Sequence, residues 1–235
     1  MQNDEELDRC VEIIQEMIKR NERVTIFSDI YKEFKDKITD YVYKNGFENT
    51  EEWIIISRAM IYKSTQYLSL GDANAILINL EKIKRIFLLN EQEKMSFDKH
   101  IHPLISKVAK EKYFNNHYAD SVESAFKEIN HRCKKIYKNK TGQEDDGASL
   151  MNMLFTPNNP QLIFEDLNTE TGKNIQKGYM QIFSGAMTGI RNPKAHENQS
   201  LDKESAYRRL VFASLLMDKI DEAIKNEIKS SNSNT

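Results

Sequence analysis

The sequence predicts an all-α protein. Apolar residues recur three and four positions apart along most of the 235-residue chain, which is the period of an α-helix. Aromatic residues make up 9% of the chain and only four residues are proline, which favours helices over a sandwich of sheets. No stretch alternates apolar and polar residues with the period of two that a half-buried strand would have.

The first half of the chain predicts four helices. Their apolar stripes run over residues 7–18, 26–41, 53–67 and 76–87. Gly46 is placed to end the second helix, and Asn49 or Thr50 to begin the third. Gly71 is expected to end the third helix, and Asp72 to cap the fourth.

The polar stretch Asn90–Lys94 separates two regions of different character. Residues 1–95 carry helical stripes but no motif, so we expect a helical N-terminal domain of unknown role. Residues 96–228 carry every sharper feature and are expected to form a second helical domain. Residues 229–235 are polar, and we expect a frayed tail there.

The second half predicts further helices with irregular chain between them. The helical stripes cover residues 101–108, 118–136, 150–155, 175–190 and 206–224. Lys138–Gly147 is predicted to be a charged loop, because it contains two glycines among polar residues. Asn158–Gly172 is expected to be irregular surface chain.

The composition is typical of a soluble globular protein, with 30% charged and 39% apolar residues. The formal net charge is −2, so any surface for nucleic acid must be a local basic patch. Acidic residues follow Met1 where a signal peptide would be basic and then apolar, and no apolar stretch is long enough to span a membrane. We therefore expect a cytoplasmic protein without membrane association.

The two cysteines, Cys10 and Cys133, lie among apolar positions of helical stripes. They are expected to be buried and reduced, because both positions face a predicted core. No Cys/His cluster has the spacing of a zinc site, so we expect neither a metal nor another cofactor.

One segment, residues 185–197, carries the residues suited to chemistry. It begins inside a predicted helix, and Pro193 removes a backbone donor and restricts the residue before it. We therefore expect the helix to end or kink near Arg191 and Asn192. On an unbroken helix Arg191 and His196 would point in different directions, whereas a break lets His196 turn back toward Arg191.

These residue types suit cleavage of an RNA phosphodiester. His196 titrates near neutral pH and can move protons. Arg191 can hold a phosphate and offset the negative charge of the transition state. Asn192, Lys194 and Glu197 are the supporting candidates, and Asn192 could hydrogen-bond the phosphate or fix the histidine. No metal is needed if the 2′-hydroxyl of the RNA is the attacking group.

A homodimer follows from the single histidine in this segment. One imidazole cannot act as base and acid in the same step, but two copies of His196 facing each other across a twofold axis would supply both. We therefore predict a composite site shared by two subunits. The spacing alone leaves a plainer alternative open, in which Arg191 makes a surface ion pair and His196 caps the next helix.

The Arg-Asn-x-x-x-His pattern of this segment matches the core of the HEPN superfamily. More of the chain, from residue 98 to about residue 226, resembles one branch of uncharacterised bacterial proteins called Ymh-type. The resembling features occur in this order: His117–Phe126, Asp146-Gly147, Leu150-Met151, Asn159-Pro160, Gly185–Met187, Arg191–Glu197 and the final helix around Ala213–Leu216.

The resemblance implies a HEPN-like helical bundle, a dimer and endoribonuclease activity for which Arg191 and His196 are essential. HEPN proteins commonly serve in toxin–antitoxin pairs and phage defence, so an antitoxin or another defence protein is an expected partner. Asn198 stands where toxins silenced by adenylylation carry a tyrosine. An adenylylating partner is therefore not expected.

A basic run follows the long predicted helix of the second half and could track an RNA backbone. It comprises Lys127, Arg132, Lys134, Lys135, Lys138 and Lys140, of which Arg132, Lys134, Lys135 and Lys138 are the RNA-binding candidates. A solvated helix face is the alternative, since cations are favoured near a helix C-terminus. Acidic residues 144–146 follow at once and favour that alternative.

Gly185 and Gly189 lie four positions apart on a predicted helix, where each glycine costs about 1 kcal/mol relative to alanine. Close approach of another helix would compensate, and that helix could belong to the same chain or to a dimer partner.

Four polar residues near these features have plain structural explanations beside functional ones. His100 and His102 are expected to lie at the surface or cap a helix, because a metal site needs more ligands. Tyr118 and Glu123 could orient Arg191 or His196, although a core tyrosine and a solvated glutamate are the simpler interpretation.

The main function predicted is thus a metal-independent endoribonuclease with RNA as its substrate. The alternatives are a non-catalytic module that binds RNA or protein, and a regulatory subunit of a defence assembly.

Overall fold

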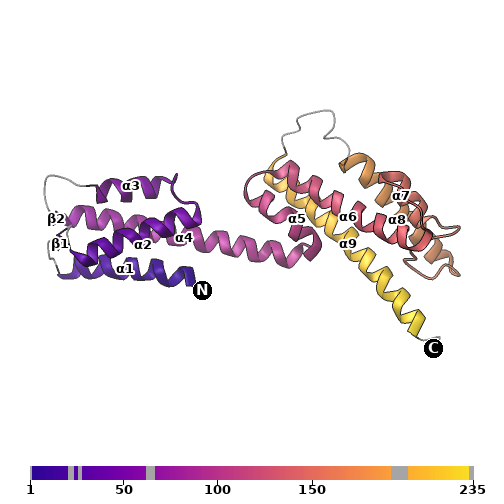
Figure 1. Cartoon of the computed structure of the whole chain (residues 1–235), viewed down its shortest axis with the longest axis horizontal. Helices are drawn as coiled ribbons and strands as arrows, with labels where there is room; N and C mark the ends of the chain where they lie inside the picture. Colours follow the sequence, from indigo (N-terminus) through magenta and orange to yellow (C-terminus); the bar gives the residue numbers. More distant parts are fainter. Residues whose placement is uncertain (1, 21–23, 26–27, 62–66, 192–200, 233–235) are drawn as a thin grey trace. The chain divides into compact units, whose positions relative to one another are not determined.

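The computed structural model describes residues 2–20, 24–25, 28–61, 67–191 and 201–232, and nearly all of its elements are helices (Figure 1). The prediction of an all-α fold is confirmed. The chain divides into two compact units, Met1–Lys94 and Met95–Thr235. Along the described residues, none of the helices is long and apolar enough to cross a lipid bilayer.

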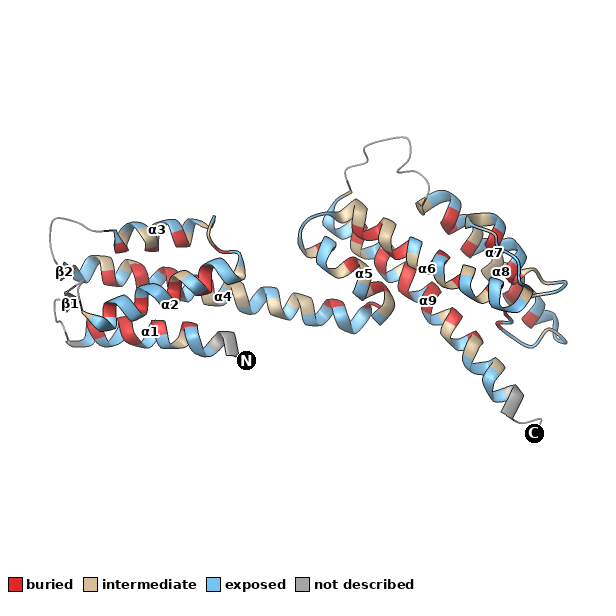
Figure 2. Cartoon of the chain, in the orientation of Figure 1, coloured by how far each residue is buried: buried red, intermediate tan, exposed pale blue. Residues whose placement is uncertain are grey.

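The described residues of the first unit form four helices. They are α1 (Gln2–Arg20), α2 (Asp29–Asn45), α3 (Glu51–Met60) and α4 (Leu70–His100), of which α4 continues beyond the unit. Their apolar faces share one core in which Ile14, Phe34 and Tyr41 are fully buried (Figure 2). Each stripe that the sequence shows at helical spacing therefore supplies one side of this core.

The predicted ends of α2 and α3 agree with the caps in the structure. Gly46 ends α2 in the left-handed conformation, at φ +74°, and the hydroxyl of Thr50 caps α3 by accepting a hydrogen bond from the backbone N–H of Trp53. The stripe predicted for α2 is wrong at Ile30, which is 57% exposed, because that residue lies in the first turn and faces solvent.

The region between α3 and α4 differs from the prediction. The helix ends at Met60, and β2 (Tyr67–Leu68) pairs with β1 (Val24–Thr25) in an antiparallel ladder. The sequence carries no alternating pattern for this pair, since two residues are too short for one to appear.

Ser69, rather than Asp72, caps α4. Its hydroxyl oxygen accepts a hydrogen bond from the backbone N–H of Asp72 at 3.0 Å. Gly71 consequently lies in the first turn of α4 and does not end the preceding helix.

The polar stretch Asn90–Lys94 is helical, because α4 runs through it without a break. Glutamate, glutamine and lysine are good helix formers, so polarity at these positions does not interrupt the backbone pattern.

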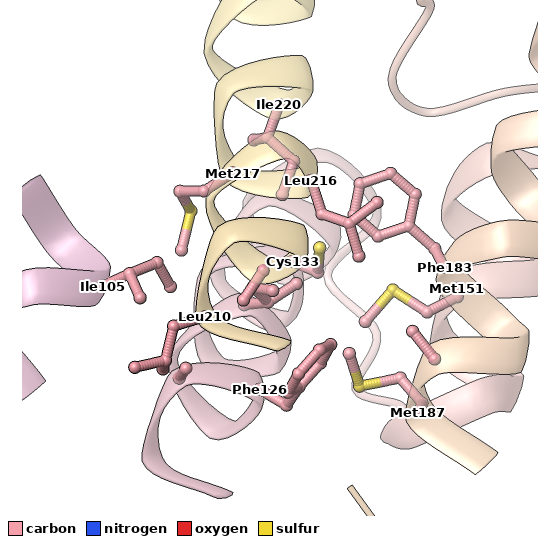
Figure 3. Packing of buried hydrophobic residues seen from close by; sticks show 14 of the residues in the cluster. Ile105, Phe126, Cys133, Met151, Phe183, Met187, Leu210, Leu216, Met217 and Ile220 are labelled. Carbon is pink, nitrogen blue, oxygen red and sulfur yellow. The ribbon is translucent and has the colours of Figure 1, made fainter. Parts of the chain in front are cut away.

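In the second unit, the part of the chain that the structure describes forms five α-helices and one π-helical turn. They are α5 (Pro103–Phe114), α6 (Tyr118–Thr141), α7 (Gly147–Phe155), α8 (Glu170–Ala186), the π-helical turn η1 (Met187–Arg191) and α9 (Lys203–Asn232). Helix α6 packs against α5 and α9, and also contacts α7 and η1. Its core residues Phe126 and Cys133 lie between Leu210 of α9 and Met151 of α7 (Figure 3).

The side chain of Gln176 holds the irregular segment between α7 and α8 in place by hydrogen bonds to its backbone. Its side chain is fully buried; Oε1 accepts a hydrogen bond from the backbone N–H of Phe164, and Nε2 donates to the carbonyl oxygens of Phe155 and Leu162. Gly172 lets the segment approach α8, because a Cβ there would lie 1.9 Å from the carbonyl oxygen of Asp166.

The buried face of α8 is rotated from the predicted stripe. Ile182 is 42% exposed, whereas Phe183 is fully buried and packs against Phe155 at a ring-centroid distance of 4.7 Å. A cluster of aromatic rings therefore sets the rotation of this helix.

Both cysteines are buried and neither forms a disulfide, as predicted for buried thiols. Burial raises the pKa of Cys10 to about 11 and that of Cys133 to about 12, which keeps both side chains as uncharged thiols.

Candidate active site

The helix that leads to the predicted motif changes its hydrogen-bonding pattern before the motif begins. Helix α8 passes at Met187 into the π-helical turn η1, which ends at Arg191. Met187 is fully buried beside Phe126 and Met151, so the turn is anchored to the core (Figure 3). This π-helical turn, a feature that often occurs at functional sites, lies directly before the predicted break, which falls outside the described residues.

Arg191 lies at the last described position before the motif continues, and its side chain is only 21% exposed. Its Nη1 donates a hydrogen bond to Oδ2 of Asp146 at 3.1 Å. Among the described residues, this carboxylate is the side chain that hydrogen-bonds the guanidinium. The contact ties η1 to the start of α7.

Asp146 is fixed from its other side by Asn130. Nδ2 of Asn130 donates to Oδ1 of Asp146 at 2.7 Å. The hydrogen bond from Asn130 has the largest effect on the pKa of the Asp146 carboxyl and lowers it. Burial opposes this effect, and Arg191 and the more distant Lys134 lower the pKa further, so that it lies below its ordinary value. The carboxylate therefore stays ionised and faces Arg191 near neutral pH.

Asn130 is itself a buried polar residue, with 5% of its surface exposed. Its Oδ1 accepts a hydrogen bond from the backbone N–H of Gly147 at 2.8 Å. Gly147 has a left-handed φ of +59°, which glycine adopts without strain. Both ends of the Asn130 amide are thus used, one by the carboxylate and one by the backbone next to it. We call Asn130, Asp146 and Arg191 the Arg191 anchor.

The remaining motif residues lie outside the described part of the chain. These are Asn192, Lys194, His196 and Glu197. The predicted approach of His196 to Arg191 consequently stays a prediction, and of the two residues the structure describes Arg191.

The predicted RNA-binding residues do not form one uniform basic surface. Arg132 forms an ion pair with Asp221, while Lys138 pairs with Glu144 at 2.5 Å and Lys134 lies 3.9 Å from it. Lys135 is exposed. Acidic neighbours therefore offset much of the charge of the run, in line with the solvated-face alternative.

The ends of the basic run are also paired. Lys127 forms an ion pair with Glu123 at 2.8 Å, and Lys140 forms one with Glu227 at 2.6 Å. Glu123 is thus engaged by Lys127, and the hydroxyl of Tyr118 donates to Asn116. Whether Tyr118 or Glu123 orients His196 stays a prediction, because His196 lies outside the described residues.

His102 takes the capping role expected for it. Its Nδ1 accepts a hydrogen bond from the backbone N–H of Leu104, so Nε2 carries the proton and donates to Oδ2 of Asp221 at 3.0 Å. Partial burial acts to raise the pKa of Asp221, but the hydrogen bonds from His102 and Arg132 outweigh it and lower that pKa. This cluster is structural, because it joins α5, α6 and α9.

Gly185 and Gly189 are exposed, and an added Cβ at either position would have no described atom within 4 Å. Packing within the described chain therefore does not explain the two glycines.

A separate open cavity of about 690 Å³ lies between the 163–168 segment and the last turns of α9. Its lining includes the carboxylates Glu165, Asp166 and Glu227, which would repel a phosphate. The cavity is thus a poor match for the predicted RNA chemistry.

Sequence reasoning found Arg191 but did not assign a role to Asn130 or Asp146. The signal for Asn130 is a polar residue on the apolar face of a helix, between Phe126 and Cys133. Such a residue is costly unless it is hydrogen-bonded, which suggests a specific partner but does not identify it.

The model of a protein family described as "Protein of unknown function (Hypoth_ymh)" matches residues 99–220. The matched stretch includes the whole Arg191 anchor. Neither the curated proteins nor the solved structures contain a significant match to this chain.

Proposed function

The chain belongs to the Hypoth_ymh family, and from this premise we propose that its second unit is a metal-independent endoribonuclease of the HEPN superfamily. Arg191 and His196 are the catalytic residues, and RNA is the substrate. The observation that best supports the proposal is the Arg191 anchor, which holds an arginine at a helix end directly before the predicted histidine.

The reaction uses the RNA's own 2′-hydroxyl. His196 of one subunit accepts the proton of this hydroxyl as its oxygen bonds to phosphorus. The bond from phosphorus to the 5′-oxygen breaks, and that oxygen takes a proton from the partner's His196. Arg191 stabilises the charge on the phosphoryl oxygens, and the products are a 2′,3′-cyclic phosphate and a 5′-hydroxyl.

Arg191 can serve this role while it contacts Asp146. A guanidinium has five N–H donors in a planar fork, and the contact with Asp146 uses one of its nitrogens. The rest of the fork can therefore turn toward a phosphate, with Asn192, Lys194 and Glu197 as supporting residues of the same segment.

The homodimer is part of the proposal, and the exposed glycine face supports it. Gly185 and Gly189 lie on the helix that carries Arg191, and no described side chain covers them. A helix of a second subunit could approach this face closely, which would bring two motifs together.

We place the activity in phage defence or a toxin–antitoxin pair, where a partner protein restrains it. The support for this role is the resemblance of the motif and its surroundings to HEPN proteins.

A non-catalytic RNA- or protein-binding module, or a regulatory subunit of a defence assembly, is the second candidate. The pairing of Lys134 and Lys138 with Glu144 favours it, because a nuclease would be expected to leave more cations for the RNA backbone.

Cleavage of labelled total RNA and tRNA in the presence of EDTA tests the proposal. Wild type should cut and leave cyclic phosphate ends, whereas His196→Ala should be inactive and Arg191→Ala should lose about 10²- to 10³-fold in kcat. His131→Ala is the matched control, because the His131 side chain is 72% exposed on α6 and lies outside the motif.

Cleavage that survives in His196→Ala, or that EDTA abolishes, would contradict the mechanism. Binding of RNA without cleavage by wild type would favour the second candidate.

A further inference from the structure

The Arg191 anchor connects three elements through one buried amide. Asn130 comes from the middle of α6, Asp146 precedes the first residue of α7, and Arg191 ends η1. A buried asparagine on an apolar helix face destabilises a protein unless both its donor and its acceptor are satisfied. Here the Nδ2 donor binds Asp146 and the Oδ1 acceptor binds Gly147, and the chain of hydrogen bonds ends at the guanidinium of Arg191, the first residue of the motif.

We propose that Asn130 and Asp146 are positioning residues that hold the Arg191 guanidinium in the orientation required for catalysis. This inference rests on the proposed function and adds to it residues that the motif does not contain. Neither residue needs to contact the RNA, because each acts through Arg191.

The geometry explains why two residues are needed. Asp146 alone is 55% exposed and could rotate freely, so its ion pair with Arg191 would be weak. Asn130 fixes one carboxylate oxygen and also binds the backbone N–H of Gly147, the next residue. The second oxygen, which Arg191 uses, is thereby aimed in a single direction.

Asp145 shows that not every carboxylate of this loop takes part. Its Oδ1 accepts a hydrogen bond from the backbone N–H of Asp146, and its Oδ2 accepts one from the hydroxyl of Ser149. The described contacts of Asp145 thus stabilise the start of α7. Asp145→Asn is a matched control with the same change of charge one residue away.

The test compares Asp146→Asn with Asp145→Asn. Asp146→Asn should lower kcat about tenfold to a hundredfold with little change in KM, because a misaligned arginine stabilises the transition state less. Asp145→Asn should keep the wild-type kcat, and Asp146→Glu should recover part of the loss. Unchanged kcat in Asp146→Asn would overturn the proposal, and so would faster cleavage, since Asp146 would then compete with the phosphate for Arg191.

A readout that does not depend on cleavage separates this proposal from the proposed function. The guanidinium N–H signals of Arg191, assigned by their absence in Arg191→Lys, should be resolved by NMR in wild type and in Asp145→Asn. They should collapse to the averaged signal of a free side chain in Asp146→Asn and in Asn130→Ala. Folding of each variant is checked by its melting temperature.

The two proposals can then fail separately. A wild type that cuts no RNA but shows an ordered Arg191 released by Asp146→Asn would contradict the nuclease and leave the positioning intact. An Arg191 that is equally ordered in Asp146→Asn would contradict the positioning, whatever the activity.

Discussion

Two arginine–carboxylate pairs in the second unit differ in their surroundings and therefore in their expected roles. Asp146, beside Arg191, is 55% exposed, so solvent can reach the pair. Asp221, beside Arg132, is 31% exposed and also accepts a hydrogen bond from the buried His102. The two arginines are about equally exposed, at 21% and 20%, so the pairs differ in their carboxylates: Asp146 is the more open to solvent, whereas Asp221 joins three helices and contributes to stability.

Asp221→Asn should lower the free energy of unfolding of the second unit by about 1–3 kcal/mol near pH 7, because Arg132 and His102 lose a charged acceptor. Urea unfolding checks this expectation. Asp218→Asn is the matched control, since Asp218 is 63% exposed and lies 3.9 Å from Nε2 of His102. An equal loss in both variants would show that net charge, and not the cluster, is responsible.

The effect of Asp221→Asn should depend on pH in a defined direction. The pKa of Asp221 is lowered in the folded chain, so its contribution is present above the ordinary carboxyl pKa of about 3.9 and is lost as the pH falls through the lowered value. The stabilities of wild type and variant should therefore begin to converge as the pH falls below about 4, and should meet once it is below the lowered pKa of Asp221. A difference that persists there would contradict the assignment.

The residues of the candidate site were predictable to different extents. Arg191 stands out because Pro193 follows it at the end of a stripe with helical spacing, and this pattern is local in sequence. Asn130 and Asp146 are 16 positions apart and meet only through the packing of α6 against α7. No local pattern encodes that contact, so sequence reasoning left the pair unassigned.

At the scale of helices, ends marked by a specific residue were predictable and rotations set by packing were not. Gly46 and Thr50 cap α2 and α3 as expected, because their effect depends on neighbouring backbone alone. The buried face of α8 depends on Phe155 and Phe164 packing against Phe183, and those residues are distant in sequence. Periodicity consequently identified the helix but placed Ile182 on the wrong side.

Gln176→Ala tests how the irregular segment before α8 is held. The variant should lower stability by about 2–3 kcal/mol, because buried backbone groups of Phe155, Leu162 and Phe164 lose their partner. Hydrogen exchange at the Phe164 amide should accelerate. Gln181→Ala is the control on the exposed face of the same helix. If exchange at the Phe164 amide were accelerated as much in Gln181→Ala, the role of Gln176 would be contradicted.

At the scale of the whole chain, two hydrophobic cores are built from separate sets of residues. One belongs to α1–α4 and contains Phe34, and the other belongs to the unit that carries Arg191 and contains Phe126. The family match covers residues 99–220 and so falls in the second unit. The first unit has a packed core of its own, and its role is unassigned.

Phe34→Ala should destabilise the first unit by about 3–5 kcal/mol, because it removes a fully buried ring. Hydrogen exchange in moderate urea should show lost protection in α2 and unchanged protection in α6. Ile30→Ala, on the exposed side of α2 one turn earlier, should change stability by no more than about 0.5 kcal/mol. Equal loss of protection in α6 would show that the two cores unfold together.

The two hydrogen bonds of the buried Asn130 amide have a consequence for how this chain can diverge. Leucine at position 130 would leave the Gly147 N–H and the Asp146 carboxylate without their partner, and aspartate there would place two carboxylates side by side. A substitution at position 130 alone is therefore disfavoured unless positions 146 and 147 change with it. Across related sequences, positions 130, 146 and 147 should covary as one inherited unit, separate from the motif that ends in His196.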